Sequence, residues 1–388
     1  VYKRQLELQR RASDWYRLQD LPVEAASYAM AANDEERTAS IVVEHARLLF
    51  DEGHGQTVRD WFDWFDQDGR RNPFPIVAML ATAATAATGD AVASMRWKAV
   101  LDRHRDSIEF HAGVAHVVDA LVCQTGVDDM LAGLRAAEEN LGADSEWFAN
   151  AVTVEGVAMS WRGEESAAVE RLRLGAELGE RFGSVVAATY AHAALADLAA
   201  LTQEYQDARI HASRAMALVD DHGLDYHFVS VLAIVMHARC LLVGGDPRSA
   251  QRMLHRAYAA RTTLCEAMPG FAVHALLAMA ETAAAIADVG GARQVLREAR
   301  GFLHGQSLGI LHDRCDRVET MLSSMSSGTP HHQALTTAEL RLLPYLRTHL
   351  SFPEIGERLF VSRHTVKTQA MSIYRKLGAS TRSEAVTS

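Results

Sequence analysis

Residues 351–377 read SFPEIGERLFVSRHTVKTQAMSIYRKL, and the expected fold of the C-terminal part of the chain follows from this segment. Its pattern predicts two short helices, at 352–359 and 363–377, with only three residues between them. So tight a connection is typical of a helix-turn-helix. Two further helices are expected on either side, at 337–347 and 382–387.

Capping signals support these helix starts. Thr336, Ser351 and Thr381 are each followed three residues later by a glutamate, which is the capping-box pattern. A fourth start, at Ser362, has the hydroxyl but carries Thr365 at the third position. The last 54 residues therefore predict a compact set of four capped helices.

The helix expected at 363–377 has two unlike faces. An apolar stripe at helical spacing must pack on the other helices, and it consists of Val366, Ala370, Ile373 and Leu377. The opposite face holds His364, Thr368, Met371 and Arg375, flanked by Thr365 and Lys367. The stretch has four basic residues and no acidic one, which suits a groove lined by phosphates.

Charge is distributed unevenly along the chain. The net charge is −10, yet residues 335–388 carry +4 and the first 334 residues carry −14. A basic module on an acidic body is expected of a nucleic-acid-binding domain on a scaffold that does not itself bind. A chance excess of four charges is the alternative.

Five segments, taken in order, resemble the core of the LuxR-type helix-turn-helix family: LTTAEL at 335–340, EIGERL at 354–359, SRHTVKT at 362–368, IYRKL at 373–377 and RSEAV at 382–386. The resemblance implies a four-helix domain that binds double-stranded DNA. It places the base contacts on Lys367, Thr368 and Met371 and implies RNA polymerase as a partner.

Side-chain chemistry agrees with these positions. Lys367 can donate to a guanine edge and Met371 can touch a thymine methyl group. Thr365, Arg375 and Lys376 suit phosphate contacts. The expected DNA-contacting residues are Lys367, Thr368, Met371, His364, Thr365, Arg375, Lys376 and Gln369. The alternatives are a partly buried core position for Met371 and an ordinary solvated face for Arg375 and Lys376.

The segment departs from the family pattern in places. Ala338 stands where the family has arginine, and Gln369 replaces a histidine; glutamine can still donate to a phosphate. Pro344 removes a helical hydrogen bond, so the first helix should kink or end early there. The chain stops at Ser388, inside the helix that dimerises the family's domains, so a homodimer on DNA is left open.

Residues 106–322 show apolar spacing typical of paired helices. Breaks recur roughly every 40 to 45 residues, at Arg162-Gly163, Gln203-Glu204, Gly244-Gly245 and Gly290-Gly291. The expected helices are 107–125, 127–141, 144–162, 165–182, 184–202, 205–222, 224–243, 247–263, 268–288 and 290–305. This pattern resembles tetratricopeptide-like repeats, which form a solenoid; a generic helical bundle is the alternative.

Residues 1–105 are also expected to be helical, at 5–18, 22–32, 34–51, 55–66, 73–88 and 90–104. Segments such as RRASDWY at 10–16 and PVEAA at 22–26 resemble the region that follows the ATP-binding module of MalT-type regulators. Trp61 and Trp64 fit that pattern and also serve as core anchors. The chain has no P-loop motif, so no cofactor is expected in it, and ATP would bind in a domain upstream of Val1.

The sequence thus predicts an all-α protein with four parts: 1–105 as the N-terminal part of a solenoid, 106–322 as helical repeats, 323–333 as a flexible linker and 334–388 as the DNA-binding domain. The linker carries His331 and His332, which we expect to be solvated rather than metal-bound. The four cysteines, Cys123, Cys240, Cys265 and Cys315, are expected to be buried and reduced.

No catalytic motif is present, so we expect no enzyme. The longest apolar stretches fall short of about 20 residues, so no membrane span and a cytoplasmic location are expected. The prediction is a bacterial transcription regulator, with activation as the expected direction, controlled by a small-molecule or protein inducer on the solenoid. The alternative is a protein-interaction scaffold with a DNA-anchoring C-terminal module.

Overall fold

The computed structural model describes residues 2–67, 74–143, 145–327, 337–348, 350–359 and 363–376. Within these ranges there are 20 α-helices and no β-strand, which confirms the all-α class. Contacts divide the chain into two compact units, Val1–Leu322 and Ser323–Ser388. Each unit is described by itself.

The first unit begins with six α-helices. Their bounds are α1 (Tyr2–Leu18), α2 (Pro22–Ala31), α3 (Glu35–Asp51), α4 (Gly55–Asp66), α5 (Pro75–Ala87) and α6 (Ala91–Arg103). They share a core that includes Trp61, which is buried, while Trp64 packs partly buried against it. The six expected helices therefore exist within one to three residues of their predicted ends.

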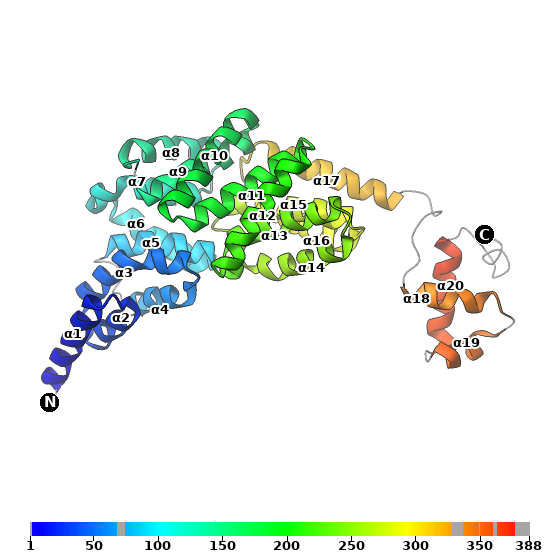
Figure 1. Ribbon diagram of the computed structural model, residues 1–388, viewed down its shortest axis with the longest axis horizontal. Coiled ribbons are helices and arrows are strands. Elements are labelled where there is room, and N and C mark those ends of the chain that lie inside the picture. Colours follow the sequence, from blue (N-terminus) through cyan, green and yellow to red (C-terminus); the bar gives the residue numbers. More distant parts are fainter. Residues whose placement is uncertain are drawn as a thin grey trace. The chain divides into compact units, whose positions relative to one another are not determined.

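Paired helices follow and make up most of the rest of this unit (Figure 1). They are α7 (Ala112–Leu121), α8 (Val127–Asn140), α9 (Glu146–Arg162), α10 (Glu165–Phe182), α11 (Val185–Leu201), α12 (Tyr205–Asp221), α13 (Phe228–Val243), α14 (Pro247–Ala260), α15 (Pro269–Ala285) and α16 (Val289–Leu303). The first helices of the later pairs, α11, α13 and α15, are buried on nearly all sides. Their partners α12, α14 and α16 bury one stripe, as amphipathic outer helices do.

A recurring turn separates several of these helices. A residue with positive φ precedes an aspartate N-cap, as at Asn33, Gly89, Gly245 and Ala287. The carboxylates of the following residues, Asp34, Asp90, Asp246 and Asp288, accept from the backbone N–H three residues on, at 2.9 to 3.2 Å. These caps satisfy amide groups that the first helical turn would leave without a partner.

Some predicted boundaries were wrong. Gly290 and Gly291 are not a break, because the turn lies at Ala287 and α16 begins at Val289. A Cβ atom on Gly291 would collide with the Tyr258 hydroxyl, so the glycine serves packing instead. The helices expected at 107–125, 224–243 and 247–263 each include a separate 3-10 turn, namely η2 (Arg105–His111), η3 (Leu224–Tyr226) and η4 (Arg261–Thr263).

The N-terminal helices contact the loops of later pairs. Gly53, after α3, approaches the carbonyl oxygen of His222 so closely that a Cβ atom there would lie 2.5 Å from it. Gly89, after α5, approaches the carbonyl oxygen of Thr262 in the same way. Both glycines have positive φ, so the turn and the close approach each favour glycine.

A buried ionic network joins the last helix of this unit, α17 (Ile310–Ser327), to α11 and α15. Arg314 is 3% exposed and binds Asp197 through two bonds of 2.6 and 2.9 Å. It also donates to Glu281 at 2.8 and 2.9 Å. His274 reaches Asp197 at 2.9 Å and Tyr190 at 3.1 Å. Desolvation raises the pKa of Asp197, but the larger combined effect of Arg314 and His274 holds that pKa below its usual range.

The expected linker begins too early. Helix α17 continues to Ser327, so the first five residues of the expected linker, 323–327, are helical, because no helix breaker occurs before Gly328. Residues 328–333, including His331 and His332, lie outside the described residues. Cys265 and Cys315 are buried as expected, whereas Cys123 and Cys240 are only partly buried; all four thiols are free.

In the described part of the chain, no helix combines the length and the apolar character needed to cross a membrane.

Candidate nucleic-acid interface

Three helices of the second unit pack on one another. They are α18 (Thr337–Leu346), α19 (Phe352–Leu359) and α20 (Arg363–Lys376). Their shared core consists of Leu342, Leu346, Ile355, Val366, Ala370, Ile373 and Tyr374. The fourth expected helix, at 382–387, lies outside the described residues.

The starts and ends of these helices follow from local chemistry. Glu354 accepts from both the backbone N–H and the hydroxyl of Ser351, each at 2.7 Å, so the glutamate half of the expected capping box is present. These bonds lower the pKa of Glu354, since they favour its charged form. Helix α18 contains Pro344 and continues to Leu346, one residue short of the expected 347, so the early end expected at the proline is not seen. The boxes at Thr336 and Thr381 lie outside the described residues.

The predicted stripe of α20 is buried. Val366, Ala370 and Ile373 are each 0% exposed, because they pack on α18 and α19. Leu377, the fourth expected member, lies outside the described residues. Tyr374 joins the same core, which the sequence reasoning did not anticipate although it follows Ala370 by one helical turn.

The described side chains of α20 outside this stripe are exposed or half-buried. Lys367 is exposed, Met371 is 57% exposed and Gln369 is half-buried. Exposure of Met371 excludes the alternative that it is a core residue. An exposed methionine next to a lysine presents both an apolar contact and a cationic donor to whatever binds this face.

Five of the expected DNA-contacting side chains are outside the described part of the structure: His364, Thr365, Thr368, Arg375 and Lys376. Their backbone lies within α20, so helical spacing alone places them relative to Lys367 and Met371. Their roles remain predictions.

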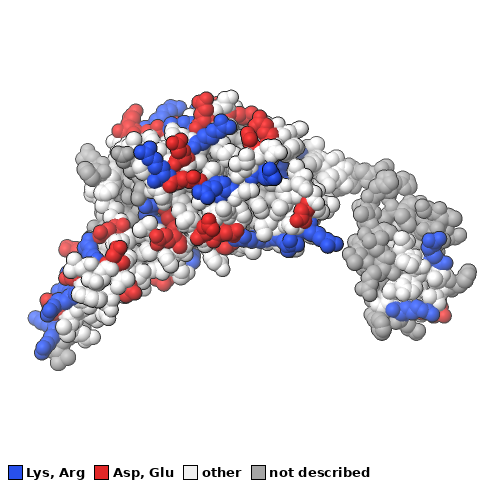
Figure 2. All heavy atoms as spheres, in the orientation of Figure 1, with Lys and Arg blue, Asp and Glu red and all other residues white. Residues whose placement is uncertain are grey.

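The first unit offers a different kind of surface. On the face seen in Figure 2, acidic and basic side chains alternate over Val1–Leu322. Several of them form exposed ion pairs, for example Arg214 with Glu180 at 2.7 Å. With the net charge of −14 over the first 334 residues, this mixed surface is unlike one built to follow a phosphate backbone.

Helices α19 and α20, packed on α18, are arranged as a helix-turn-helix module. Proteins of this class bind DNA through the second helix of the pair. Residues 333–388 match the model of the family described as bacterial regulatory proteins, luxR family. A search of curated proteins found no match for the chain. The family match indicates a DNA-binding transcription regulator and points to a regulator rather than an enzyme.

Proposed function

We propose that the chain is a sequence-specific transcription regulator, with activation as its direction, in which α20 enters the major groove. The observation that carries this proposal is the division of α20 into a fully buried stripe and an exposed face with Lys367 and Met371. In this pose Lys367 donates to a guanine edge, Thr368 contacts a neighbouring base and Met371 touches a thymine methyl group.

Phosphate contacts hold the helix in register. We assign them to Thr365, Arg375 and Lys376, with His364 and Gln369 as further donors at the edges of the face. Such contacts are insensitive to sequence and weaken as salt rises. They set the orientation in which the base-reading residues act.

We further propose that residues 1–322 form a tetratricopeptide-like solenoid of MalT-like lineage that receives the signal. The support is the repeated pairing of a buried helix with an amphipathic one. An inducer on this unit promotes association of two chains, which places two modules on adjacent half-sites. Effective concentration then raises affinity without new contacts, and RNA polymerase is recruited.

The test compares Lys367→Ala and Thr368→Ala with the unmodified chain. The ligands are a duplex recovered by selection from a random pool and a scrambled duplex of the same composition. Losing a base contact should weaken binding to the selected duplex about 5- to 150-fold, because one good contact contributes about 1–3 kcal/mol. Binding to the scrambled duplex should change much less, and the melting temperature should not fall.

The matched control is Arg209→Ala, which removes one exposed charge from α12 in the other unit. It should leave both duplex affinities unchanged. If Lys367→Ala and Thr368→Ala behave like this control, the recognition face is assigned wrongly. An interaction scaffold with a DNA-anchoring module would then explain the chain better.

A further inference from the structure

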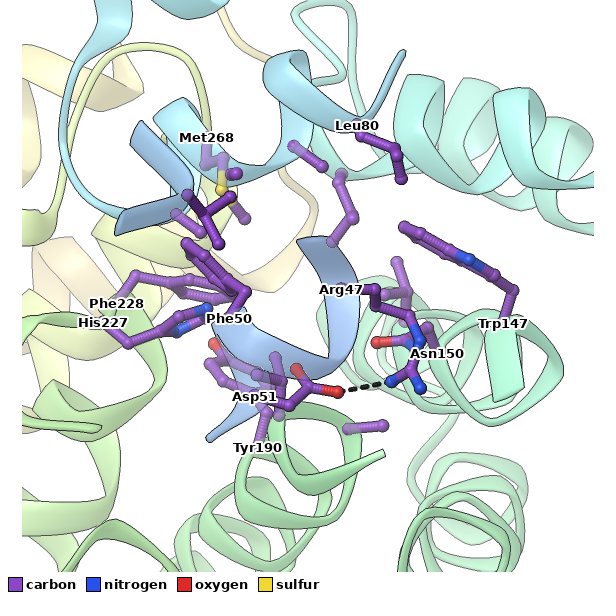
Figure 3. A pocket seen from close by; sticks show the side chains of 18 of the residues that line it. Arg47, Phe50, Asp51, Leu80, Trp147, Asn150, Tyr190, His227, Phe228 and Met268 are labelled. Carbon is purple, nitrogen blue, oxygen red and sulfur yellow. Dashed lines mark hydrogen bonds and ion pairs between the residues drawn. The ribbon is translucent and has the colours of Figure 1, made fainter. Parts of the chain in front are cut away.

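A cavity of about 90 Å³ lies inside Val1–Leu322, where α3–α5 meet α9, α11, α13 and α15 (Figure 3). Its wall is mostly apolar and combines aliphatic side chains with six aromatic ones, namely Phe50, Phe62, Trp147, Tyr190, Phe228 and Phe271. One water needs about 10–15 Å³, and an apolar cavity of about 150 Å³ can hold benzene. At about 90 Å³ the space is smaller than that cavity, so a single ring is the upper limit and fits only with part of it in the opening of the pocket to solvent.

The charged groups in the wall neutralise each other. Arg47 binds Asp51 at 2.5 Å, and Asp51 is 5% exposed (Figure 3). A buried pair of this kind is held by its own attraction, and a charged ligand would have to compete with it. The wall therefore favours a ligand without net charge.

Other polar groups of the wall are already engaged. The Tyr190 hydroxyl hydrogen-bonds His274 at 3.1 Å, and the side-chain amide of Asn150 donates to Ser184 at 2.9 Å. These contacts are made with residues outside the wall. They leave the cavity largely apolar, which favours a ring over a strongly hydrated ligand.

His227 is different, because it retains an unused donor. It is 4% exposed, and its Nδ1 accepts the backbone N–H of Val229 at 3.3 Å, where it caps α13. Burial lowers the pKa of His227 to about 3, so the ring is neutral near pH 7 and its proton sits on Nε2. Among the described residues no partner hydrogen-bonds this Nε2.

We propose that this cavity binds a small neutral ring compound whose carbonyl oxygen accepts a hydrogen bond from Nε2 of His227. The rings of Phe50 and Phe228 flank this histidine at centroid distances of 5.1 and 4.9 Å. They supply the apolar contact, while the imidazole supplies orientation. The inference rests on the proposed function, since the bound compound is the signal that residues 1–322 receive.

Three matched probes test the site on the full chain by ligand-observed NMR titration. Cyclohexanone carries the acceptor, methylenecyclohexane has the same shape without it, and cyclohexylammonium carries a charge. About seven heavy atoms predict dissociation constants in the millimolar range. Cyclohexanone should bind about 5- to 10-fold more tightly than methylenecyclohexane, as one net hydrogen bond provides. Cyclohexylammonium should not bind.

Two variants localise the binding. His227→Asn keeps an acceptor for the α13 cap but removes the Nε2 donor, so it should weaken cyclohexanone binding about 5- to 10-fold and leave methylenecyclohexane unchanged. Ala84→Leu adds carbon atoms to the cavity wall on α5 and should abolish binding of both compounds. The control His255→Asn changes an exposed histidine of α14 outside this cavity and should have no effect.

The proposal is overturned if cyclohexanone and methylenecyclohexane bind equally, if neither binds, or if Ala84→Leu binds like the unmodified chain. Selective duplex binding, measured on the same samples, separates this result from the proposed function. If the probes do not bind but selective duplex binding is intact, only the proposed ligand site is overturned. If the probes bind but selective duplex binding is absent, only the proposed DNA-reading role of α20 is overturned.

Discussion

His227 should make the stability of the first unit depend on pH. Burial lowers its pKa in the folded chain from the ordinary 6.5 to about 3. As pH falls below 6.5, His227 therefore binds a proton in the unfolded chain but stays neutral in the folded chain. Stability is lost with decreasing pH until the folded pKa is reached. His227→Asn removes this group but preserves the N-cap of α13, because asparagine is also a strong capping residue.

The size of the effect follows from the two pKa values. Each unit of difference corresponds to about 1.4 kcal/mol, so the full gap is worth about 5 kcal/mol at pH 3 or below. Between pH 7 and pH 5 only part of this difference contributes. Over that range the free energy of unfolding of the unmodified chain should fall by about 2 kcal/mol through His227. Because His227 is 4% exposed, little of this is screened by solvent.

Urea unfolding followed by tryptophan fluorescence measures the effect in the right unit. All six tryptophans lie in residues 1–322, at Trp15, Trp61, Trp64, Trp97, Trp147 and Trp161. The free energy of unfolding should fall by about 2 kcal/mol less in His227→Asn than in the unmodified chain between pH 7 and pH 5. Equal losses in both proteins would refute the argument that His227 is kept neutral by burial.

Three further outcomes are expected. Arg314→Met leaves the buried carboxylate of Asp197 and the partly buried carboxylate of Glu281 without their main partner and should lower the free energy of unfolding by about 3–5 kcal/mol, seen in the same urea assay. Gly291→Ala must displace the ends of the Tyr258 and Asp288 side chains, which hydrogen-bond each other at 3.0 Å, so it should be less stable than Gly301→Ala, which lies on the same helix with open space and should stabilise by up to about 1 kcal/mol; equal melting temperatures would contradict this. Arg375→Ala should weaken selected and scrambled duplexes alike and reduce the slope of log affinity against log salt by about one, unlike a base-reading variant.

Much of the local structure could be predicted because it depends on near neighbours in sequence. The apolar period of 363–377 placed Val366, Ala370 and Ile373 in a core, and they are buried. The turn before α16 was missed because its positive-φ residue is Ala287. Positive φ is usual for glycine and rare for alanine, so the sequence does not indicate a left-handed conformation there. The available signal was Asp288, an N-cap one residue before the helix.

The long-range features could not be predicted. Arg314, Asp197 and Glu281 are separated by many residues, and nothing local in the sequence indicates that they pair. The cavity wall likewise brings Phe50 of α3 next to His227, the N-cap of α13. Helix periodicity can place each residue on a face of its own helix, but it does not show that the two residues meet. Exposure of Met371 was also undecided by spacing alone, because a methionine suits a core and a binding surface equally.

Whether α20 reads DNA sequence can be measured by selection from a randomised 30-base-pair duplex library at near-physiological salt. If α20 reads sequence, the selection should yield an enriched motif, which Lys367→Ala weakens at a defined position of the site. A two-fold symmetric motif would further show that two chains bind together. No enrichment, with binding that only fades as salt rises, would contradict the claim, because phosphate contacts alone would then explain the affinity.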